Sequence, residues 1–289
     1  DLNGITSLEN MFASCTSITT INNINSWNLN SVTNINGMFS STLFNQYIGN
    51  WDVSNVTSMY GTFSNNPSFN QNIGTWNVYN VQNMSYMLQN ALLFNQNLGT
   101  WNVSNVTGMT GMLDYCGINQ YNYDSLLISW SALTLQNNVT FGVAGLQYSD
   151  NPCPSYSART YIQTTYNWSF VGDSANICPS FISKWRTLSP NTTIYLPYSP
   201  TGTYLGTIDW GDGTITNSSY SDSYHEYSSP GEYTIQINGT IVGWDFNTYY
   251  NSNDNIIEVL QFGPIRGEYD NDANMFAYCP NLVLTGVTD

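Results

Sequence analysis

The sequence predicts a repeat solenoid followed by an all-β sandwich, and three observations support this fold class. A unit of about 25 residues recurs in the first part of the chain, most clearly as FNQNIGTWNVYNVQNMSYML (69–88) and FNQNLGTWNVSNVTGMTGML (94–113). Within each unit, apolar residues alternate in one part and are spaced by three or four in another. From about residue 177 onward, short alternating segments are separated by Gly and Pro turns, as in β-sandwiches.

Each repeat is expected to form one turn of the solenoid. Ile73, Trp76 and Val78 indicate a short strand, whereas Val81, Met84 and Met87 have the spacing of one or two helical turns. A unit this small cannot bury its apolar face alone, so neighbouring turns must stack. We therefore predict a short strand plus a short helix in every 25-residue turn.

Large aromatic residues recur at fixed places in the unit, and they have two interpretations. They can form a ladder in the core, or an outward stripe that stacks on sugars. We favour the core because Ile and Val flank each tryptophan. The predicted ladder consists of Trp27, Trp51, Trp76, Trp101, Phe44, Phe69 and Phe94.

The repeat pattern and its interruptions suggest four parts. Residues 1–113 form the solenoid, and residues 114–173 form an α/β segment that caps it, because the last turn of a solenoid otherwise exposes its core. Residues 174–264 form the sandwich. Residues 265–289 contain NMFAYC, which matches NMFASC at residues 10–15, and are read as the start of a further repeat turn.

Composition excludes several classes of function. The net charge is −15 with only four Lys and Arg residues, so there are too few cations for a phosphate backbone and we expect no nucleic-acid partner. No apolar run is long enough to span a bilayer, so we expect no membrane insertion. Only 8% of the residues are charged. A surface of neutral polar groups is common in extracellular and cell-surface proteins, which is the localisation we expect. No signal peptide or initial Met is seen, which suggests a mature protein or an excerpt.

The five cysteines fall into two groups. Cys153 and Cys178 flank a segment of their own and are predicted to form a disulfide, in keeping with an oxidising compartment. Cys15, Cys116 and Cys279 occupy the same place in the repeat, and we interpret them as buried thiols of the solenoid core.

Sequons for N-glycosylation are numerous, although Asn, Ser and Thr are so frequent that chance explains their number. Those inside the repeats have a second interpretation, in which the Asn side chain bonds to the backbone of a neighbouring turn. The candidate sites are Asn55, Asn83, Asn102, Asn105, Asn138, Asn167, Asn191, Asn217 and Asn238.

Residues for catalysis are scarce, so we predict no enzymatic activity and no cofactor. The only histidine, His225, lies on an expected sandwich strand and is interpreted as a surface or packing residue. Asp209 and Asp212 in DWGDG are weak candidates for calcium ligands, since a tight turn explains them more simply. A solenoid that degrades polysaccharides needs clustered acidic and basic residues on one face, and the repeats have almost none.

The chain resembles a known family over nearly its whole length. The repeats, NYDSLLISWSALTLQNNVTFGVAGLQYS (122–149) and ARTYIQTTYNWSFVGD (158–173) are similar to BspA-like surface proteins, which have leucine-rich-type (LRR-like) repeats of 25 residues. IDWGDGTIT (208–216) and HEYSSPGEYTIQINGTI (225–241) resemble the PKD/Ig-like sandwich of the same proteins. The resemblance implies a bacterial-type cell-surface or secreted protein with adhesive or structural duties and no catalysis. In that family the sandwich usually precedes the repeats, whereas here it follows them.

The two ends of the chain match each other in repeat phase. Laid end to end, Met275 and Met11 are one repeat apart, and Cys279 lies one turn from Cys15. Our hypothesis is therefore a head-to-tail filament of this protein, made by a heterologous contact that does not close or as one period of a long tandem polypeptide. The predicted junction residues are Leu2, Ile5, Leu8, Met11, Cys15, Met275, Phe276 and Cys279.

The alternative function is a monomeric adhesin that binds host or environmental glycans or proteins. Exposed tyrosines of the sandwich are the expected contact residues in that case, namely Tyr220, Tyr224, Tyr227, Tyr249 and Tyr250.

Overall fold

The computed structural model describes residues 2, 4–151, 153–178, 180–246, 252–263, 265–267 and 275–284. The chain divides into two compact units. The first comprises Asp1–Ser149 and Ser155–Asn176, and the second comprises Asp150–Pro154 and Ile177–Asp289.

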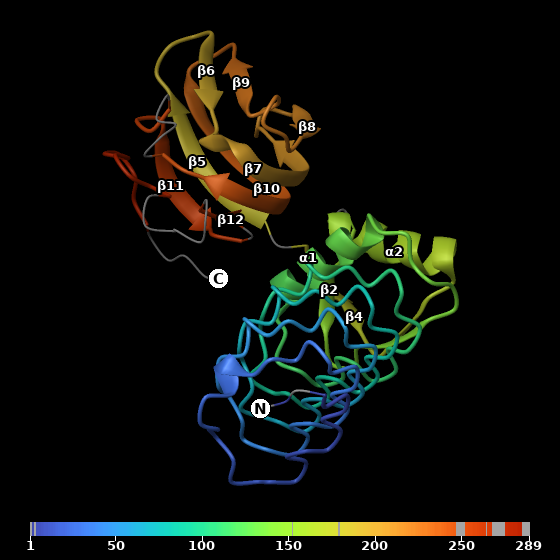
Figure 1. The fold of residues 1–289 in the computed structure, drawn as a ribbon. Helices are drawn as coiled ribbons and strands as arrows, with labels where there is room; N and C mark the ends of the chain where they lie inside the picture. The colour runs from blue at the N-terminus through green and yellow to red at the C-terminus, as the bar shows by residue number, and fades with distance from the viewer. Residues whose placement is uncertain are drawn as a thin grey trace. The chain divides into compact units, whose positions relative to one another are not determined.

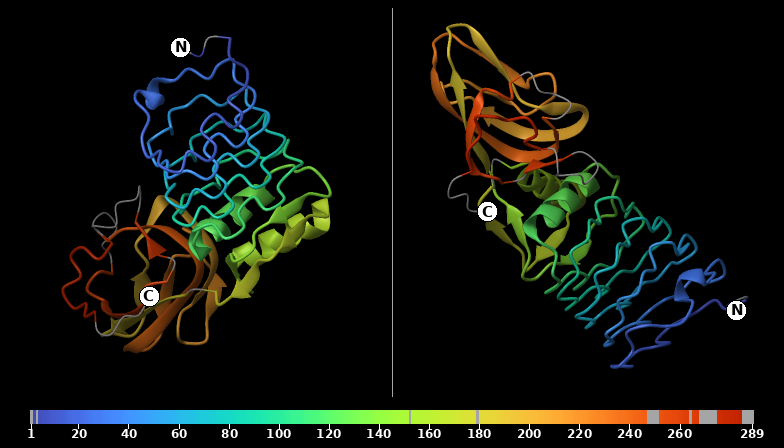
Figure 2. Two further views of the ribbon diagram at one scale, coloured as in Figure 1. Left: turned by 90° about the horizontal axis from the view of Figure 1, so that it is seen from below. Right: turned by 90° about the vertical axis from the view of Figure 1, so that its left-hand side faces the viewer.

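The first unit begins with successive loops of chain that lie one against the next, coloured blue through teal in the two views of Figure 2. We call residues 7–117 the repeat stack. Isolated parallel bridges join equivalent positions of neighbouring repeats: Ser7 to Asn34, Asn34 to Ser58, Ser58 to Asn83 and Asn83 to Gly108. The repeat period thus places equivalent residues beside each other.

The predicted solenoid with a strand and a helix in each turn is wrong. The repeat stack contains no strand beyond single-residue bridges, and its only helical element is the 3-10 helix η1 (Ile24–Ser26). In the described part of the chain there are only two α-helices, and the rest of the regular structure consists of small, open β-sheets.

Hydrogen-bonded turns produce the apolar spacing that suggested a helix. The N–H of Met87 donates to the carbonyl of Met84 at 3.1 Å, and the N–H of Ala91 donates to that of Leu88, also at 3.1 Å. The third residue of each turn, Tyr86 or Asn90, has a φ of 57°. A left-handed residue at this place is typical of type II turns and interrupts a helix. Two such turns in succession repeat apolar residues every three or four positions, as a helix does.

Two helices and two short parallel sheets complete the first unit (Figure 1). Helix α1 (Gln120–Ser131) begins at Asn119, whose side chain accepts a hydrogen bond from the N–H of Asn122. Helix α2 (Pro154–Tyr166) lies between the strands in sequence. The strands pair as β1 (Thr140–Gly142) with β3 (Ser169–Val171), and as β2 (Gln147–Ser149) with β4 (Ser174–Asn176).

The apolar core of the first unit is continuous from the repeats into these elements. One cluster of buried residues extends from Leu8 through the repeats to Trp168. Helix α1 adds Tyr123, Leu126, Leu127 and Trp130 to this cluster. The helix therefore buries the last repeat, because its apolar face meets the same core.

The second unit is all-β, which is compatible with the prediction for this part of the chain. Its main sheet has the order β11-β5-β10-β7-β8, and β12 pairs with β10. These strands are β5 (Ser180–Thr187), β7 (Tyr198–Asp209), β8 (Ile215–Asn217), β10 (Gly231–Trp244), β11 (Ile256–Gln261) and β12 (Ile265–Arg266). Strands β6 (Thr192–Tyr195) and β9 (Tyr224–Tyr227) form a separate antiparallel pair. The core contains Trp185, Trp210 and Trp244, all fully buried.

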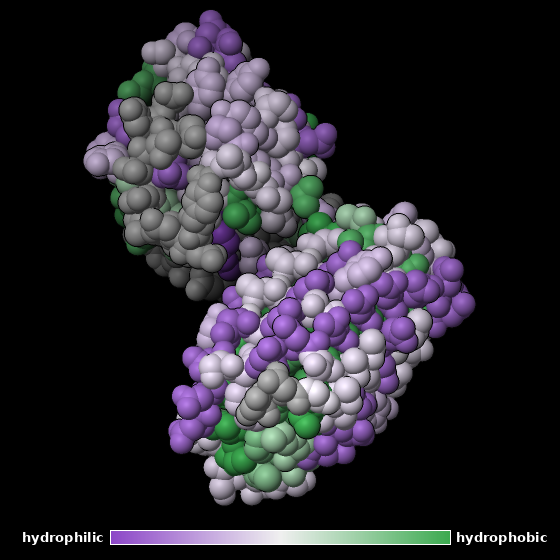
Figure 3. Space-filling model, in the orientation of Figure 1, coloured by the Kyte–Doolittle hydropathy of each residue, from purple (hydrophilic) through white to green (hydrophobic). Residues whose placement is uncertain are grey.

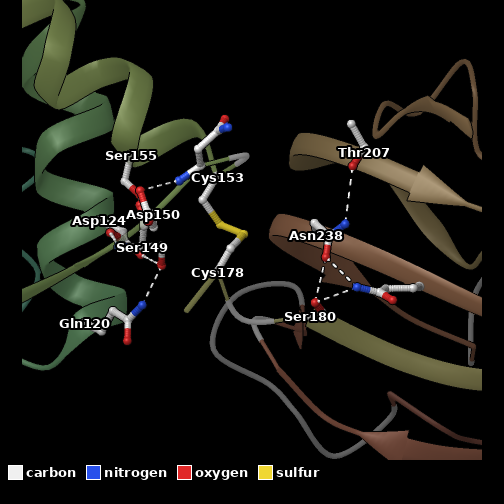
Figure 4. Close-up of a disulfide and its surroundings, with 12 residues drawn as sticks. Gln120, Asp124, Ser149, Asp150, Cys153, Ser155, Cys178, Ser180, Thr207 and Asn238 are labelled. Carbon is white, nitrogen blue, oxygen red and sulfur yellow. Dashed lines mark hydrogen bonds between the residues drawn. A yellow bond between two sulfur atoms is a disulfide. The ribbon is translucent and has the colours of Figure 1, made fainter. Parts of the chain in front are cut away.

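A disulfide joins Cys153 and Cys178, the pair that the sequence favoured (Figure 4). Their Cα atoms are 5.6 Å apart, and they close a loop with a sequence separation of 25 residues. Such a bridge stabilises a protein chiefly by restricting the unfolded chain.

Replacement of both cysteines by serine is expected to lower the free energy of unfolding by about 3 kcal/mol, from the entropy of a loop of this length. Denaturant unfolding of the double variant, compared with the unmodified protein under oxidising conditions, measures the change. Finding both residues as free thiols in non-reducing peptide maps of the unmodified protein would contradict the assignment.

Candidate functional site

Three of the four tryptophans of the repeats lie inside the stack, where they cannot stack on an external sugar. Trp51, Trp76 and Trp101 are at most 4% exposed, whereas Trp27 is half-buried. Each buried indole Nε1–H donates to a carbonyl about one repeat earlier; for Trp76 the acceptor is the oxygen of Ile48, at 3.0 Å. Rings of Trp51 and Trp76 stack at 6.3 Å. Phe44, Phe69 and Phe94 are fully buried as well.

In one segment of each repeat, represented by residues 8–14, the main-chain hydrogen bonds to the neighbouring repeat run in one direction. The N–H groups of Leu8, Asn10, Phe12 and Ser14 donate to the carbonyls of Asn34, Asn36, Met38 and Ser40, at 2.8–3.0 Å. The same pattern recurs at each later step of the repeat stack. In this segment each repeat therefore directs its N–H groups toward the next repeat and its carbonyls toward the previous one, whereas Thr33, Thr57 and Thr107 just before it donate in the opposite direction.

This polarity leaves one edge of the repeat stack open. The corresponding carbonyls of the first repeat belong to Ser7, Glu9, Met11 and Ala13, and no described residue donates a hydrogen bond to them. We call this row of acceptors the open edge. Ile5 and Met11 beside it are 42% and 48% exposed. The space-filling view shows apolar atoms gathered over the first repeats (Figure 3).

A short segment of the second unit has the local conformation of the first repeat. Residues 275–282 follow the same succession of turns as residues 11–18. Tyr278 has a φ of 57°, and Ser14 at the matching position has 62°. The N–H of Leu282 donates to the carbonyl of Cys279 at 3.3 Å, as Ile18 donates to Cys15 at 3.0 Å. We call residues 275–284 the tail segment.

The tail segment has donors where the open edge has acceptors. The main-chain N–H groups of Phe276 and Tyr278 have no hydrogen-bond partner in the described part of the chain. They correspond to Phe12 and Ser14, which donate to the next repeat. In the register of the repeat stack, their acceptors on a following repeat are the carbonyls of Met11 and Ala13.

The predicted junction residues differ in burial. Leu8 is 3% exposed, and Leu2 packs against the core of the first unit. Met275, Phe276 and Cys279 are half-buried against the core of the second unit, where burial raises the pKa of the Cys279 thiol to about 12. The interpretation of the three free cysteines as buried thiols of the solenoid core is wrong for Cys15, which is exposed, and for Cys279; only Cys116 is buried there. The sequence did not indicate Ala13 and Tyr278, which act through main-chain atoms that no side-chain pattern reveals.

The DWGDG turn has its carboxylates occupied by local hydrogen bonds. Asp209 accepts from the N–H of Gly211 and Asp212 from that of Thr214, each at 2.9 Å. The other oxygen of Asp212 pairs with Nε2 of His225 at 2.7 Å. Burial opposes ionisation of Asp212, but the hydrogen bonds from His225 and Thr214 lower its pKa overall. These contacts explain both aspartates as turn residues.

No group of three or more His, Cys, Asp or Glu side chains among the described residues is placed to hold a metal ion. None of the helices in the described ranges is long and apolar enough to cross a membrane.

The asparagines of the sequons have different environments. Asn55 and Asn105 each donate through Nδ2 to a carbonyl of the previous repeat, at 2.9 and 2.8 Å. Asn83 and Asn238 are half-buried, and Asn238 lies within β10. The other sequon asparagines are exposed, namely Asn102, Asn138, Asn167, Asn191 and Asn217.

Comparison with known proteins gives one match. Residues 6–126 match the model of a family described as Mycoplasma protein of unknown function, DUF285. This match covers less than half of the chain. A search of curated proteins found no match, and neither did a search of solved structures.

Proposed function

We propose that this protein is a non-enzymatic extracellular structural protein whose units join head to tail into filaments. The joint places the tail segment of one unit on the open edge of the next. It forms between separate molecules or between successive units of one longer polypeptide, and the experiment below distinguishes these two arrangements.

One observation carries the proposal: unpaired donors and unpaired acceptors occur at matching positions of the same repeat register. Phe276 and Tyr278 supply the N–H groups, and Met11 and Ala13 supply the carbonyls. Unpaired main-chain groups at an edge favour the addition of another stretch of chain. Because the two surfaces differ, the contact is heterologous, and it continues into a filament when the rotation between successive units does not close a ring.

The remaining chemistry supports a structural role. His225 and Asp212 pair with each other beside a turn, and Asp212 also accepts from the main-chain N–H of Thr214 in that turn. The disulfide and the scarcity of charged residues support an extracellular location. The BspA-like resemblance supports a cell-surface protein. A monomeric adhesin is the alternative, and it assigns no role to the open edge.

The test is negative-stain microscopy together with sedimentation velocity of the native protein. We expect fibres or a series of oligomers. Met11→Asp adds a charge at the open edge and should abolish assembly without loss of folding, since Met11 is about half exposed. The matched control is Leu92→Asp, because Leu92 is 58% exposed on a later repeat, away from the open edge.

Denaturing electrophoresis of the assembled material identifies the kind of joint. Separate subunits give a band at 32.3 kDa, the mass of this chain. A tandem polypeptide gives a far larger species. The proposal fails if the native protein is a monodisperse monomer, or if Met11→Asp assembles as the unmodified protein does.

A further inference from the structure

A polar groove with aromatic walls lies on a lateral face of the repeat stack. It has a volume of about 340 Å³ and crosses the first four repeats. Its lining includes Asn36, Tyr60, Gly61, Tyr86 and Gln89. This volume is at the lower end of the range of about 300–1,000 Å³ that is usual for small-ligand sites.

The groove lies where two of the four repeats that it crosses have glycine and the other two have a side chain. Asn10, Gly37, Gly61, Tyr86 and Gly111 occupy equivalent positions, and all five have φ between 55° and 61°. A Cβ atom built on Gly61 meets only the Cβ of Ser64, at 3.8 Å. The floor at Gly61 is therefore open, between the side chains of Asn10 on one side and Tyr86 on the other.

Tyr86 is an unusual residue for its position, because the equivalent residues of the other repeats are glycine or asparagine. Glycine and asparagine adopt a left-handed φ readily, whereas a bulky aromatic residue rarely does. The ring of Tyr86 lies over Gly111, where a Cβ atom would be 2.5 Å from its Cδ1. It also meets the ring of Tyr60 edge to face, with centroids 5.5 Å apart. Strained residues of this kind are concentrated at binding sites, and this one builds the wall of the groove.

Polar side chains in the groove have hydrogen-bonding capacity to spare. The Oδ1 of Asn36 accepts from the hydroxyl of Ser58 at 2.7 Å and from the N–H of Tyr60 at 2.8 Å. No hydrogen bond involves its Nδ2 or the side-chain amides of Asn10 and Gln89, as far as the described residues show. Glu9 accepts one bond, from Asn34 at 3.2 Å. The groove thus offers both donors and acceptors beside half-exposed rings.

Charge restricts the class of ligand. The repeat stack contains no Lys or Arg, since the four basic residues are Arg159, Lys184, Arg186 and Arg266. Glu9 and the net charge of −15 disfavour an anion. An anion is therefore excluded, and a ligand that fits the lining must donate and accept hydrogen bonds and must have an apolar face for a tyrosine ring. A pyranose sugar has these three properties, because its C–H groups form one face and its hydroxyls form the rim.

We propose that this groove binds a pyranose residue of a neutral glycan, which packs against Tyr86 and Tyr60 above Gly61. Asn36 and Gln89 donate to its hydroxyl oxygens, and Glu9 accepts from a hydroxyl. The groove adjoins the open edge at Glu9, but it uses the side chain of this residue, whereas the open edge uses its main-chain carbonyl.

Binding is tested by saturation-transfer NMR and calorimetry on the full chain. The probes are the neutral oligosaccharides cellotriose, mannotriose, chitotriose and lactose, with sialyllactose as the anionic comparison. We expect at least one neutral probe to bind and sialyllactose to bind more weakly than lactose. Measurements repeated in the Met11→Asp background keep the result independent of assembly.

Two variants test the groove without endangering the fold. Tyr86→Gly restores the residue that other repeats have at this φ and should reduce affinity at least tenfold with no loss of thermal stability. Gly61→Asn places on the floor a residue that Asn10 shows to be compatible with this φ, and it should block binding by filling the hollow. Tyr79→Ala is the control, since Tyr79 is 49% exposed outside the groove. Failure of every neutral probe to bind at millimolar concentration, or unchanged affinity in Tyr86→Gly, overturns the proposal.

Discussion

Replacement of Trp76 by alanine is expected to lower the free energy of unfolding by about 3–5 kcal/mol, the usual cost of truncating a large buried aromatic side chain. The indole is 3% exposed and packs between Trp51 and Phe63, each with centroids 6.3 Å away. Its removal also leaves the carbonyl of Ile48 without the indole donor. Because the cavity lies between two repeats, both neighbours lose contacts.

Denaturant unfolding followed by circular dichroism measures this change. Tyr79→Ala is the matched control, because Tyr79 belongs to the same repeat and is exposed; its stability should stay close to that of the unmodified protein. If Trp76→Ala retained full stability and lost only sugar binding, the tryptophans would be ligand-binding residues and their placement in the core would be wrong.

Replacement of Arg159 by alanine is expected to destabilise the first unit by about 3–5 kcal/mol, because it leaves a buried carboxylate without its counter-ion. Nε and Nη2 of Arg159 each donate to a carboxylate oxygen of Asp173 at 2.8 Å, and the Asp173 side chain is 1% exposed. Burial alone would lower the pKa of Arg159, but the hydrogen bonds and charge of Asp173 raise it overall. The guanidinium also lies over the rings of Tyr148 and Phe170.

Arg186→Ala is the matched control for this experiment. Arg186 pairs with Glu232 at the same distance of 2.8 Å, but both side chains are about half exposed. Exposed pairs contribute little to stability because water solvates each partner after the pair is broken. Thermal unfolding of the two variants should therefore differ strongly. Equal and small effects would mean that the charge of Asp173 is accommodated without Arg159.

Apolar periodicity was insufficient to decide whether the repeats contain helices or successions of turns. Val81, Met84 and Met87 are spaced by three, which a helix and a succession of turns satisfy equally. The difference lies in the left-handed φ of Tyr86 and Asn90. Asparagine is common in this left-handed conformation, whereas tyrosine is rare in it. The prediction of a helix failed because the backbone conformation at Tyr86 does not follow from its residue type. It depends on the packing of this residue against neighbouring repeats.

The exposure of individual tyrosines was also difficult to infer from the sequence. Tyr227 was expected at the surface of the second unit, yet it is 1% exposed and its hydroxyl donates to the carbonyl of Trp210 at 2.7 Å. Tyr220 and Tyr224 are exposed, and Tyr249 and Tyr250 lie outside the described residues. The tyrosines of the groove, Tyr60 and Tyr86, were not singled out because nothing local marks them.

The sequence alone determined the period of the repeats and hence which residues lie beside each other. Equal spacing brings Trp51, Trp76 and Trp101 to equivalent positions, and their bulk and apolarity bury them. Tertiary structure decided the direction of the hydrogen bonds between repeats, and with it the open edge at Ser7–Ala13. It also decided the groove, whose lining brings together Gly37, Gly61 and Tyr86 from three different repeats. Both features depend on contacts between residues about 25 positions apart, for which local sequence preferences carry no information.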